Sequence, residues 1–171
     1  MPGARDPTSS GTNTPVETIL IVEDDTVVAA FLTAAIEQET PYQALLATSS
    51  SQAFEVVNEC KPSLFLLDYR LPGMSGLELY DQLHATRELE DVPALLISAS
   101  FPFEEASKRN ILLIQKPFEL DHLLRNIERL RADLDVIQEM HLASQYPSSR
   151  SKNTNIHTLS LSDHLQRTKG D

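Results

Sequence analysis

Four apolar runs in the sequence each lead into a residue that could take part in metal or phosphoryl chemistry. The residues are Glu23 and Asp24 after residues 18–22, Asp68 after 64–67, Ser98 after 92–97, and Lys116 soon after 111–114. If the runs are parallel strands of one sheet, the residues that follow them lie at the same edge. The sequence therefore predicts a cluster of carboxylates, a hydroxyl and a lysine from four distant segments.

Such a cluster needs positive charge. Two carboxylates held about 5 Å apart repel by about 3 kcal/mol at an effective dielectric near 20. Lys116 supplies one positive charge, and a hard divalent cation would supply two more. Mg²⁺ suits this role, because it prefers oxygen ligands and binds through one or two carboxylates. An aspartate flanked by Mg²⁺ and a lysine is typical of phosphoryl transfer, in which positioning and charge neutralisation provide most of the catalysis.

Asp68 stands between an apolar run and a turn. Residues 64–67 are all apolar, and Pro72 and Gly73 follow soon after. A continuous apolar run bounded by turn residues is typical of a strand buried on both faces. Ser75 is placed to cap the helix that comes next. The alternative for Asp68 by itself is a turn-forming aspartate after a core strand.

Glu23, Asp24 and Asp25 form an acidic triplet directly after the first apolar run. The alternative to a binding site is helix capping, because carboxylates at a helix N-terminus satisfy N–H groups and favour the macrodipole. One capping carboxylate is ordinary, but three in a row after a buried strand favour a binding site.

Strand-like and helix-like segments alternate five times. The predicted strands are residues 18–22, 42–47, 64–68, 92–97 and 111–114, and the predicted helices are residues 27–36, 50–60, 76–87, 102–109 and 118–144. This alternation predicts an α/β fold with a doubly wound, five-stranded parallel sheet, helices on both faces and right-handed crossovers.

The last predicted helix carries a heptad pattern of apolar residues. They are Leu120, Leu123, Ile127, Leu130, Leu134 and Ile137. The first half can pack on the sheet, whereas the extension at 131–144 could pair with a second copy of the chain, giving a homodimer through residues 120–141. The alternatives are a frayed extension or one that folds back on its own domain. His141 is interpreted as the weak end of the stripe.

Composition limits the function classes. Residues 16–130 hold 8 Lys and Arg against 19 Asp and Glu, which accounts for the net charge of −11 and disfavours nucleic-acid binding. Cys60 is the single cysteine, so no internal disulfide can form. No apolar run approaches the roughly 18 residues of a membrane span, and a signal-peptide core is lacking. We expect a cytoplasmic domain at 16–130 between disordered tails at 1–15 and 145–171.

Four strings in order, ILIVEDD, LFLLDYRLPGMSGLEL, LLISAS and IQKPF, resemble the receiver domain of two-component response regulators. The resemblance covers about residues 17–130. It implies a flavodoxin-like sheet with strand order 2-1-3-4-5, and a signalling protein that is not an enzyme. It also implies a histidine kinase or phosphotransfer protein as the phosphoryl donor.

The resemblance also implies a role for each residue of the predicted cluster. Asp68 matches the phosphoacceptor. Glu23 and Asp24 match the acidic pair that holds Mg²⁺, and the backbone carbonyl of Arg70 matches a further metal ligand. The remaining matches are Ser98, with the hydroxyl that moves toward the aspartyl phosphate, and Lys116, with the lysine that contacts phosphate oxygens. The Lys116–Pro117 bond is expected to be cis.

Two departures from the family pattern concern the output. Leu113 stands where the family usually has Tyr or Phe, an aromatic side chain that turns inward upon phosphorylation. That switch is not expected here unless Phe101 or Phe103 substitutes. The 18 residues from Ser98 to Lys116 are about one helical turn fewer than usual, so the fourth helix should be short. An atypical output surface follows as a hypothesis.

Three functions remain open. The first is a single-domain response regulator that acts through an unknown downstream protein or serves as a phosphate sink. The second is a phosphorylation-independent interaction module that dimerises through the long helix. The third is a small phosphatase or hydrolase that uses Asp68 as nucleophile. Arg70 disfavours it, because the HAD-type phosphatase pattern needs an acid two residues after its nucleophile.

Overall fold

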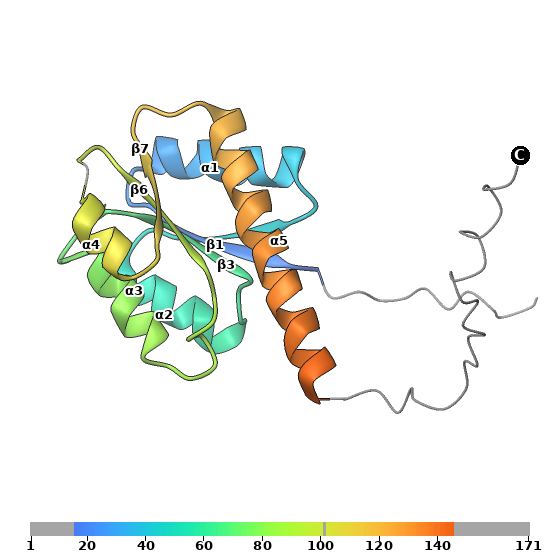
Figure 1. Ribbon diagram of the computed structural model, residues 1–171. Helices are drawn as coiled ribbons and strands as arrows, with labels where there is room; N and C mark the ends of the chain where they lie inside the picture. Colours follow the sequence, from blue (N-terminus) through green and yellow to red (C-terminus); the bar gives the residue numbers. More distant parts are fainter. Residues whose placement is uncertain (1–15, 101, 146–171) are drawn as a thin grey trace, which may run out of the picture. The chain divides into compact units, whose positions relative to one another are not determined.

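The computed structural model describes residues 16–100 and 102–145. Its elements are β1 Thr18–Val22, α1 Thr26–Glu39, β2 Gln43–Ala47, α2 Ser50–Glu59, β3 Leu64–Asp68, β4 Arg70–Leu71, β5 Met74–Ser75, α3 Gly76–His84, β6 Ala94–Ser98, α4 Phe103–Lys108, β7 Leu112–Gln115 and α5 Leu120–Gln145 (Figure 1). Two compact units divide between residues 136 and 137, and the described part of the second is the helical stretch 137–145. The tails expected at 1–15 and beyond residue 145 lie outside the described residues.

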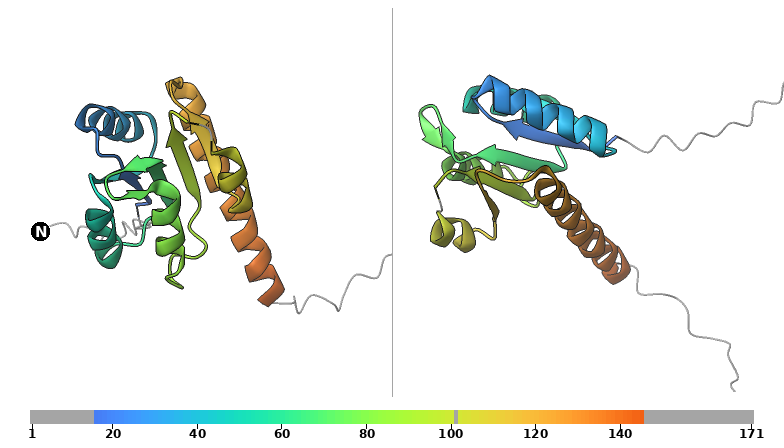
Figure 2. Two further views of the ribbon diagram at one scale, coloured as in Figure 1. Left: turned by 90° about the vertical axis from the view of Figure 1, so that its left-hand side faces the viewer. Right: turned by 90° about the horizontal axis from the view of Figure 1, so that it is seen from above.

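Five strands form one parallel sheet in the order β2-β1-β3-β6-β7. Because β6 and β7 are the fourth and fifth strands of this sheet, the predicted order 2-1-3-4-5 is confirmed. Helices α2, α3 and α4 cover one face, and α1 and α5 cover the other (Figures 1 and 2). The doubly wound α/β fold is therefore as predicted.

The three central strands explain why their sequences are continuously apolar. Every residue of β1, β3 and β6 is buried. Successive side chains alternate between two hydrophobic cores, so Leu20 packs with α2 and α3, while Ile19 and Ile21 pack with α1 and α5. A carboxylate that follows such a strand is thereby held at a fixed place on the sheet edge.

Helix caps fix the chain where it leaves two of these strands. Asp25 caps α1 by accepting the N–H groups of Val27 and Val28 at 2.9 and 3.0 Å. Ser75 caps α3 in a reciprocal capping box with Glu78, as the sequence predicted for Ser75. Asp25, the third carboxylate of the acidic triplet, therefore caps α1, whereas Glu23 and Asp24 do not cap this helix and can form a binding site.

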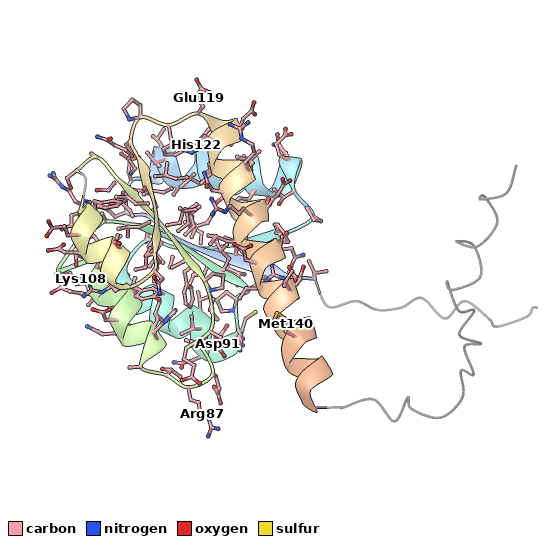
Figure 3. All side chains as sticks on the ribbon, in the orientation of Figure 1. Arg87, Asp91, Lys108, Glu119, His122 and Met140 are labelled. Carbon is pink, nitrogen blue, oxygen red and sulfur yellow. The ribbon has the colours of Figure 1, made fainter. Side chains whose placement is uncertain are left out.

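Several segments differ from the predictions. A two-stranded hairpin, β4–β5, occupies the predicted turn after β3. Helix α3 ends at His84, because Leu89 and Val92 are buried in the core and the chain must turn back to bring them there. Arg87 projects outward from this turn (Figure 3), and Asp91 is also exposed. Helix α5 begins at Leu120, two residues later than predicted.

Helix α4 has six residues, which agrees with the predicted shortening. Along α5, Leu123 and Ile127 are fully buried against the sheet, and Arg131 pairs with Glu17 through two hydrogen bonds. Leu134 is half-buried, and Val136 is 56% exposed. Among the described residues, no helix has both the length and the apolar character needed to cross a membrane.

Candidate phosphoryl-acceptor and metal site

Three carboxylates meet at the carboxyl edge of the sheet. Oxygen atoms of Glu23, Asp24 and Asp68 all lie within 4.8 Å of one another. Val22 is in register with Leu67, so the residues that follow them, Glu23 and Asp68, become neighbours. Glu23 and Asp68 are only 2% and 7% exposed, whereas Asp24 is exposed. The predicted convergence of residues 45 positions apart is therefore observed.

Lys116 directly follows the edge strand β7 and contacts two members of this cluster. Its Nζ lies 2.6 Å from Asp68 Oδ1 and 3.0 Å from Glu23 Oε2. Its backbone N–H donates to the Ser98 carbonyl at 2.8 Å, which fixes the loop after β7 beside the end of β6. The Lys116–Pro117 peptide bond is cis, as the resemblance implied.

The electrostatics of the cluster are unbalanced. Burial raises the pKa of Glu23, the charge of Asp68 raises it further, and the hydrogen bond from Lys116 offsets only part of the rise. Burial by itself lowers the pKa of Lys116, but the hydrogen bonds to Asp68 and Glu23 outweigh it and leave that pKa above its ordinary value. One held cation therefore faces three carboxylates, which leaves a net negative charge.

The donor set fits a hard divalent cation. Carboxylate oxygens are the ligands that Mg²⁺ prefers, and one exposed member, Asp24, leaves the cluster open to water. No cysteine or histidine belongs to the group, so a soft metal such as copper is disfavoured. The residues present therefore match the magnesium site expected from the sequence.

The backbone around Asp68 is tightly constrained. Asp68 Oδ2 accepts the Arg70 N–H at 2.7 Å, and the Gly76 N–H donates to the Tyr69 carbonyl at 2.9 Å. A Cβ atom on Gly76 would lie 2.2 Å from the Asp68 carbonyl oxygen, so only glycine fits there. This role of Gly76 was not predicted from the sequence. No local sequence pattern signals this contact, because it depends on how closely the start of α3 approaches the end of β3.

Arg70 lies in the β4–β5 hairpin, paired with Ser75, and its N–H donates to the Asp68 carboxylate. The predicted use of its carbonyl as a metal ligand stays a prediction, and its side chain is exposed.

Ser98 ends β6 and is 1% exposed. Asp68 is in register with Ile97, so Ser98 lies one residue beyond the neighbour of Asp68. The Ser98 Oγ accepts the Ser100 N–H at 3.1 Å and lies 3.2 Å from the Ser100 hydroxyl. Ser98 is therefore at the predicted edge, with a hydroxyl that Ser100 holds in place.

Leu113, at the position of the usual aromatic residue, is half-buried in β7 and packs against the core beneath α2, α3 and α4. An aliphatic side chain in that environment cannot present a ring that moves between inward and outward positions. The position that usually holds the aromatic switch residue is therefore occupied by an aliphatic side chain that packs against the core.

The family model for the response regulator receiver domain matches residues 19–128. The chain belongs to this family. The match covers more than half of the 171 residues and contains every residue of the cluster described above. The receiver resemblance drawn from the four sequence strings is confirmed.

Two curated relatives differ in how much of their length this receiver covers. The phosphate regulon transcriptional regulatory protein PhoB of Pseudomonas aeruginosa is 36% identical over 124 residues, which cover 69% of this chain and 52% of PhoB. Sporulation initiation phosphotransferase F of Bacillus subtilis is 30% identical over 109 residues, which cover 63% of this chain and 87% of that protein. The chain therefore spans about half the length of PhoB.

Solved receiver structures share the architecture. A CheY-like receiver domain from Methylobacillus flagellatus aligns with a TM-score of 0.62 at 23% identity, over 67% of this chain and 98% of that chain. The non-phosphorylated HemR receiver domain from Leptospira biflexa aligns with a TM-score of 0.60 at 28% identity, over 67% and 94% of the two chains. The first of these likenesses concerns the fold alone.

Proposed function

We propose that this receiver accepts a phosphoryl group on Asp68 from a histidine kinase or a phosphotransfer protein, in a Mg²⁺-dependent reaction. The observation that carries the proposal is the double contact of Lys116 Nζ with the buried carboxylates of Asp68 and Glu23. A lysine that neutralises a buried carboxylate nucleophile beside further acidic oxygens suits a reaction in which negative charge gathers at one point.

The transfer exchanges one phosphorus bond for another. A carboxylate oxygen of Asp68 forms a bond to phosphorus while the donor's N–P bond breaks, and the electron pair leaves with the imidazole. Lys116, which contacts the Asp68 carboxylate before the transfer, then also pairs with the phosphoryl oxygens. The Ser98 hydroxyl, now beside Ser100, turns to donate a hydrogen bond to the new group.

Glu23, Asp24 and Asp68 would hold Mg²⁺, with the Arg70 carbonyl as a further ligand. The bound ion would neutralise charge on the carboxylates and on the incoming phosphoryl oxygens. The chain's own residues prepare this site, because Lys116 already reduces the repulsion between Glu23 and Asp68.

We further propose that the receiver is a cytoplasmic single-domain regulator whose output is a protein–protein contact with a downstream protein, and that it catalyses no reaction on a separate substrate. The Bacillus relative, named a phosphotransferase, matches over 87% of its own length, which supports a receiver that works without an attached effector. The net charge of −11 supports protein partners over nucleic acid.

Acetyl phosphate tests the acceptor directly. In the presence of MgCl₂, intact-mass analysis should show a single phosphoryl adduct that is stable in acid and labile in base. Asp68→Asn should abolish the adduct and EDTA should prevent it, whereas Asp25→Asn, which keeps a capping side chain, should retain it. An adduct that persists in Asp68→Asn, or none with any small-molecule or kinase donor, would contradict the proposal.

A second candidate is a phosphorylation-independent module that dimerises through residues 120–141. The half-buried Leu113, the six-residue α4 and the 56% exposed Val136 favour it. Sedimentation of the full chain and of a chain lacking residues 131–171 separates the two candidates. Only the dimerising module requires that the full chain be a dimer without any phosphoryl donor and that the deletion convert it to a monomer.

A further inference from the structure

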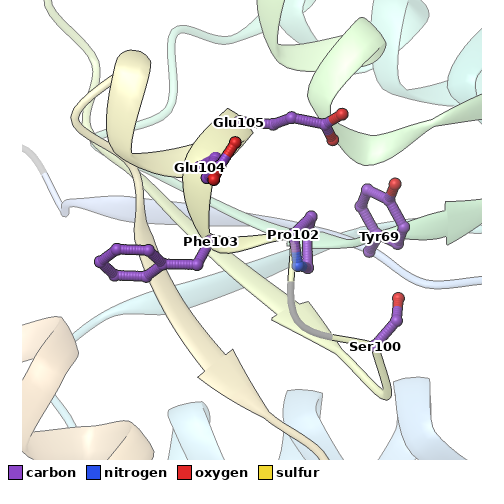
Figure 4. A pocket seen from close by; sticks show the side chains of 6 residues that line it. All are labelled: Tyr69, Ser100, Pro102, Phe103, Glu104 and Glu105. Atoms are coloured by element: carbon purple, nitrogen blue, oxygen red, sulfur yellow. The ribbon is translucent and has the colours of Figure 1, made fainter.

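A cavity of about 510 Å³ lies beside the acceptor site and is not used by the phosphoryl chemistry above. Its walls are Tyr69, Ser100, Pro102, Phe103, Glu104 and Glu105 (Figure 4). Tyr69 directly follows Asp68 in the chain, and the Ser100 hydroxyl is 3.2 Å from that of Ser98. Any protein that delivers a phosphoryl group to Asp68 must approach the surface in which this cavity opens.

The cavity combines an aromatic wall with carboxylates. Tyr69 and Ser100 are half-buried, whereas Glu104 and Glu105 are exposed. In Figure 4 the Phe103 ring points away from Tyr69, so Tyr69 supplies the aromatic surface, and Glu105 extends toward the same side as Tyr69. This is a mixed, acidic cavity rather than a purely apolar one.

The two carboxylates have no ion-pair partner among the residues that the structure describes. Arg109, one helical turn after Glu105, donates instead from Nε and Nη2 to the Asp81 carboxylate, each at 2.7 Å, and from Nη1 to the Glu105 backbone carbonyl at 3.0 Å. Acidic residues in the first turn of a helix do favour its macrodipole. The helix macrodipole does not explain why Glu104 and Glu105 line a cavity together with Tyr69.

We propose that this cavity receives an arginine side chain of the protein that delivers the phosphoryl group, an inference that rests on the proposed function. A guanidinium group is planar, stacks on an aromatic face such as Tyr69, and presents several N–H donors to a carboxylate. Glu105 and the Ser100 hydroxyl supply the matching acceptors. The net charge of −11 would also speed the approach of a basic surface.

NMR titration of the ¹⁵N-labelled protein with Nα-acetyl-arginine methylamide tests this assignment. Saturable shifts should appear at the amides of Tyr69, Ser100, Glu104 and Glu105. The corresponding citrulline compound, which has the same shape without the charge, should produce far smaller shifts. The double substitution Glu104→Gln, Glu105→Gln should weaken arginine binding about fivefold, from the size of exposed ion-pair contributions.

The control is the double substitution Glu88→Gln, Glu90→Gln, which removes the same charge from exposed positions in the turn after α3. It should leave the arginine affinity unchanged. Equal shifts from arginine and citrulline, or equal weakening by the two double substitutions, would overturn the inference. Acetyl phosphate labelling of the wild-type protein, run in parallel, tests the acceptor function alone, because that donor carries no arginine.

Discussion

Replacing Lys116 by Gln should expose the repulsion that this lysine now offsets. The substitution removes the cation that contacts Asp68 Oδ1 at 2.6 Å and Glu23 Oε2 at 3.0 Å. The two carboxylate side chains are 8% and 3% exposed, so water cannot replace the lost partner fully. Breaking a buried ion pair on one side typically costs 3–5 kcal/mol, and because Lys116 itself is 25% exposed we expect about 2–4 kcal/mol.

Urea unfolding without divalent cations, followed by circular dichroism, measures this loss. Adding MgCl₂ should then stabilise Lys116→Gln by more than it stabilises the wild type, since the variant's three carboxylates bind a dication more tightly. The matched control is Lys61→Gln, an exposed lysine, which should change the free energy of unfolding by less than about 0.5 kcal/mol. Equal stabilities of the two variants in Mg²⁺-free buffer would refute the electrostatic reasoning.

Three further predictions concern the scaffold. Gly76→Ala should lower the free energy of unfolding by about 2 kcal/mol in urea and slow acetyl phosphate labelling, because its Cβ would lie 2.2 Å from the Asp68 carbonyl oxygen; unchanged values would show that β3 tolerates the shift. Ser75→Ala should cost about 1 kcal/mol in the same assay, from loss of the α3 capping box. Burial lowers the pKa of His84, so the unfolded chain binds the extra proton first and stability should fall as the pH drops below about 6.5. In His84→Gln the urea midpoint should change less between pH 7.5 and 5.5; an equal change would assign the effect to other groups.

Much of the site could be predicted from the sequence, because each central strand is buried on both faces and therefore reads as an unbroken apolar run. The run that ends before Glu23 locates the end of β1 to the residue, and the run that ends before Asp68 locates the end of β3 to within one residue. Parallel pairing then places those ends at one edge, so the carboxylate cluster follows from pattern and topology together.

What the sequence could not supply depends on contacts between distant segments. The need for glycine at position 76 comes from the approach of the Asp68 carbonyl, which no local pattern encodes. The early end of α3 reflects the burial of Leu89 and Val92. The ion pair between Arg109 and Asp81, which are 28 residues apart, also depends on how α3 and α4 pack.

The central claim is that residues from four strand ends form one site that accepts a phosphoryl group at Asp68. Beryllofluoride, a phosphoryl mimic, tests it most directly in an NMR titration of the full chain with Mg²⁺ present. The account predicts simultaneous shifts at the amides of Asp24, Asp68, Ser98 and Lys116, all lost in Asp68→Asn. Shifts confined to other parts of the chain, or a response that survives the loss of the Asp68 carboxylate, would contradict it.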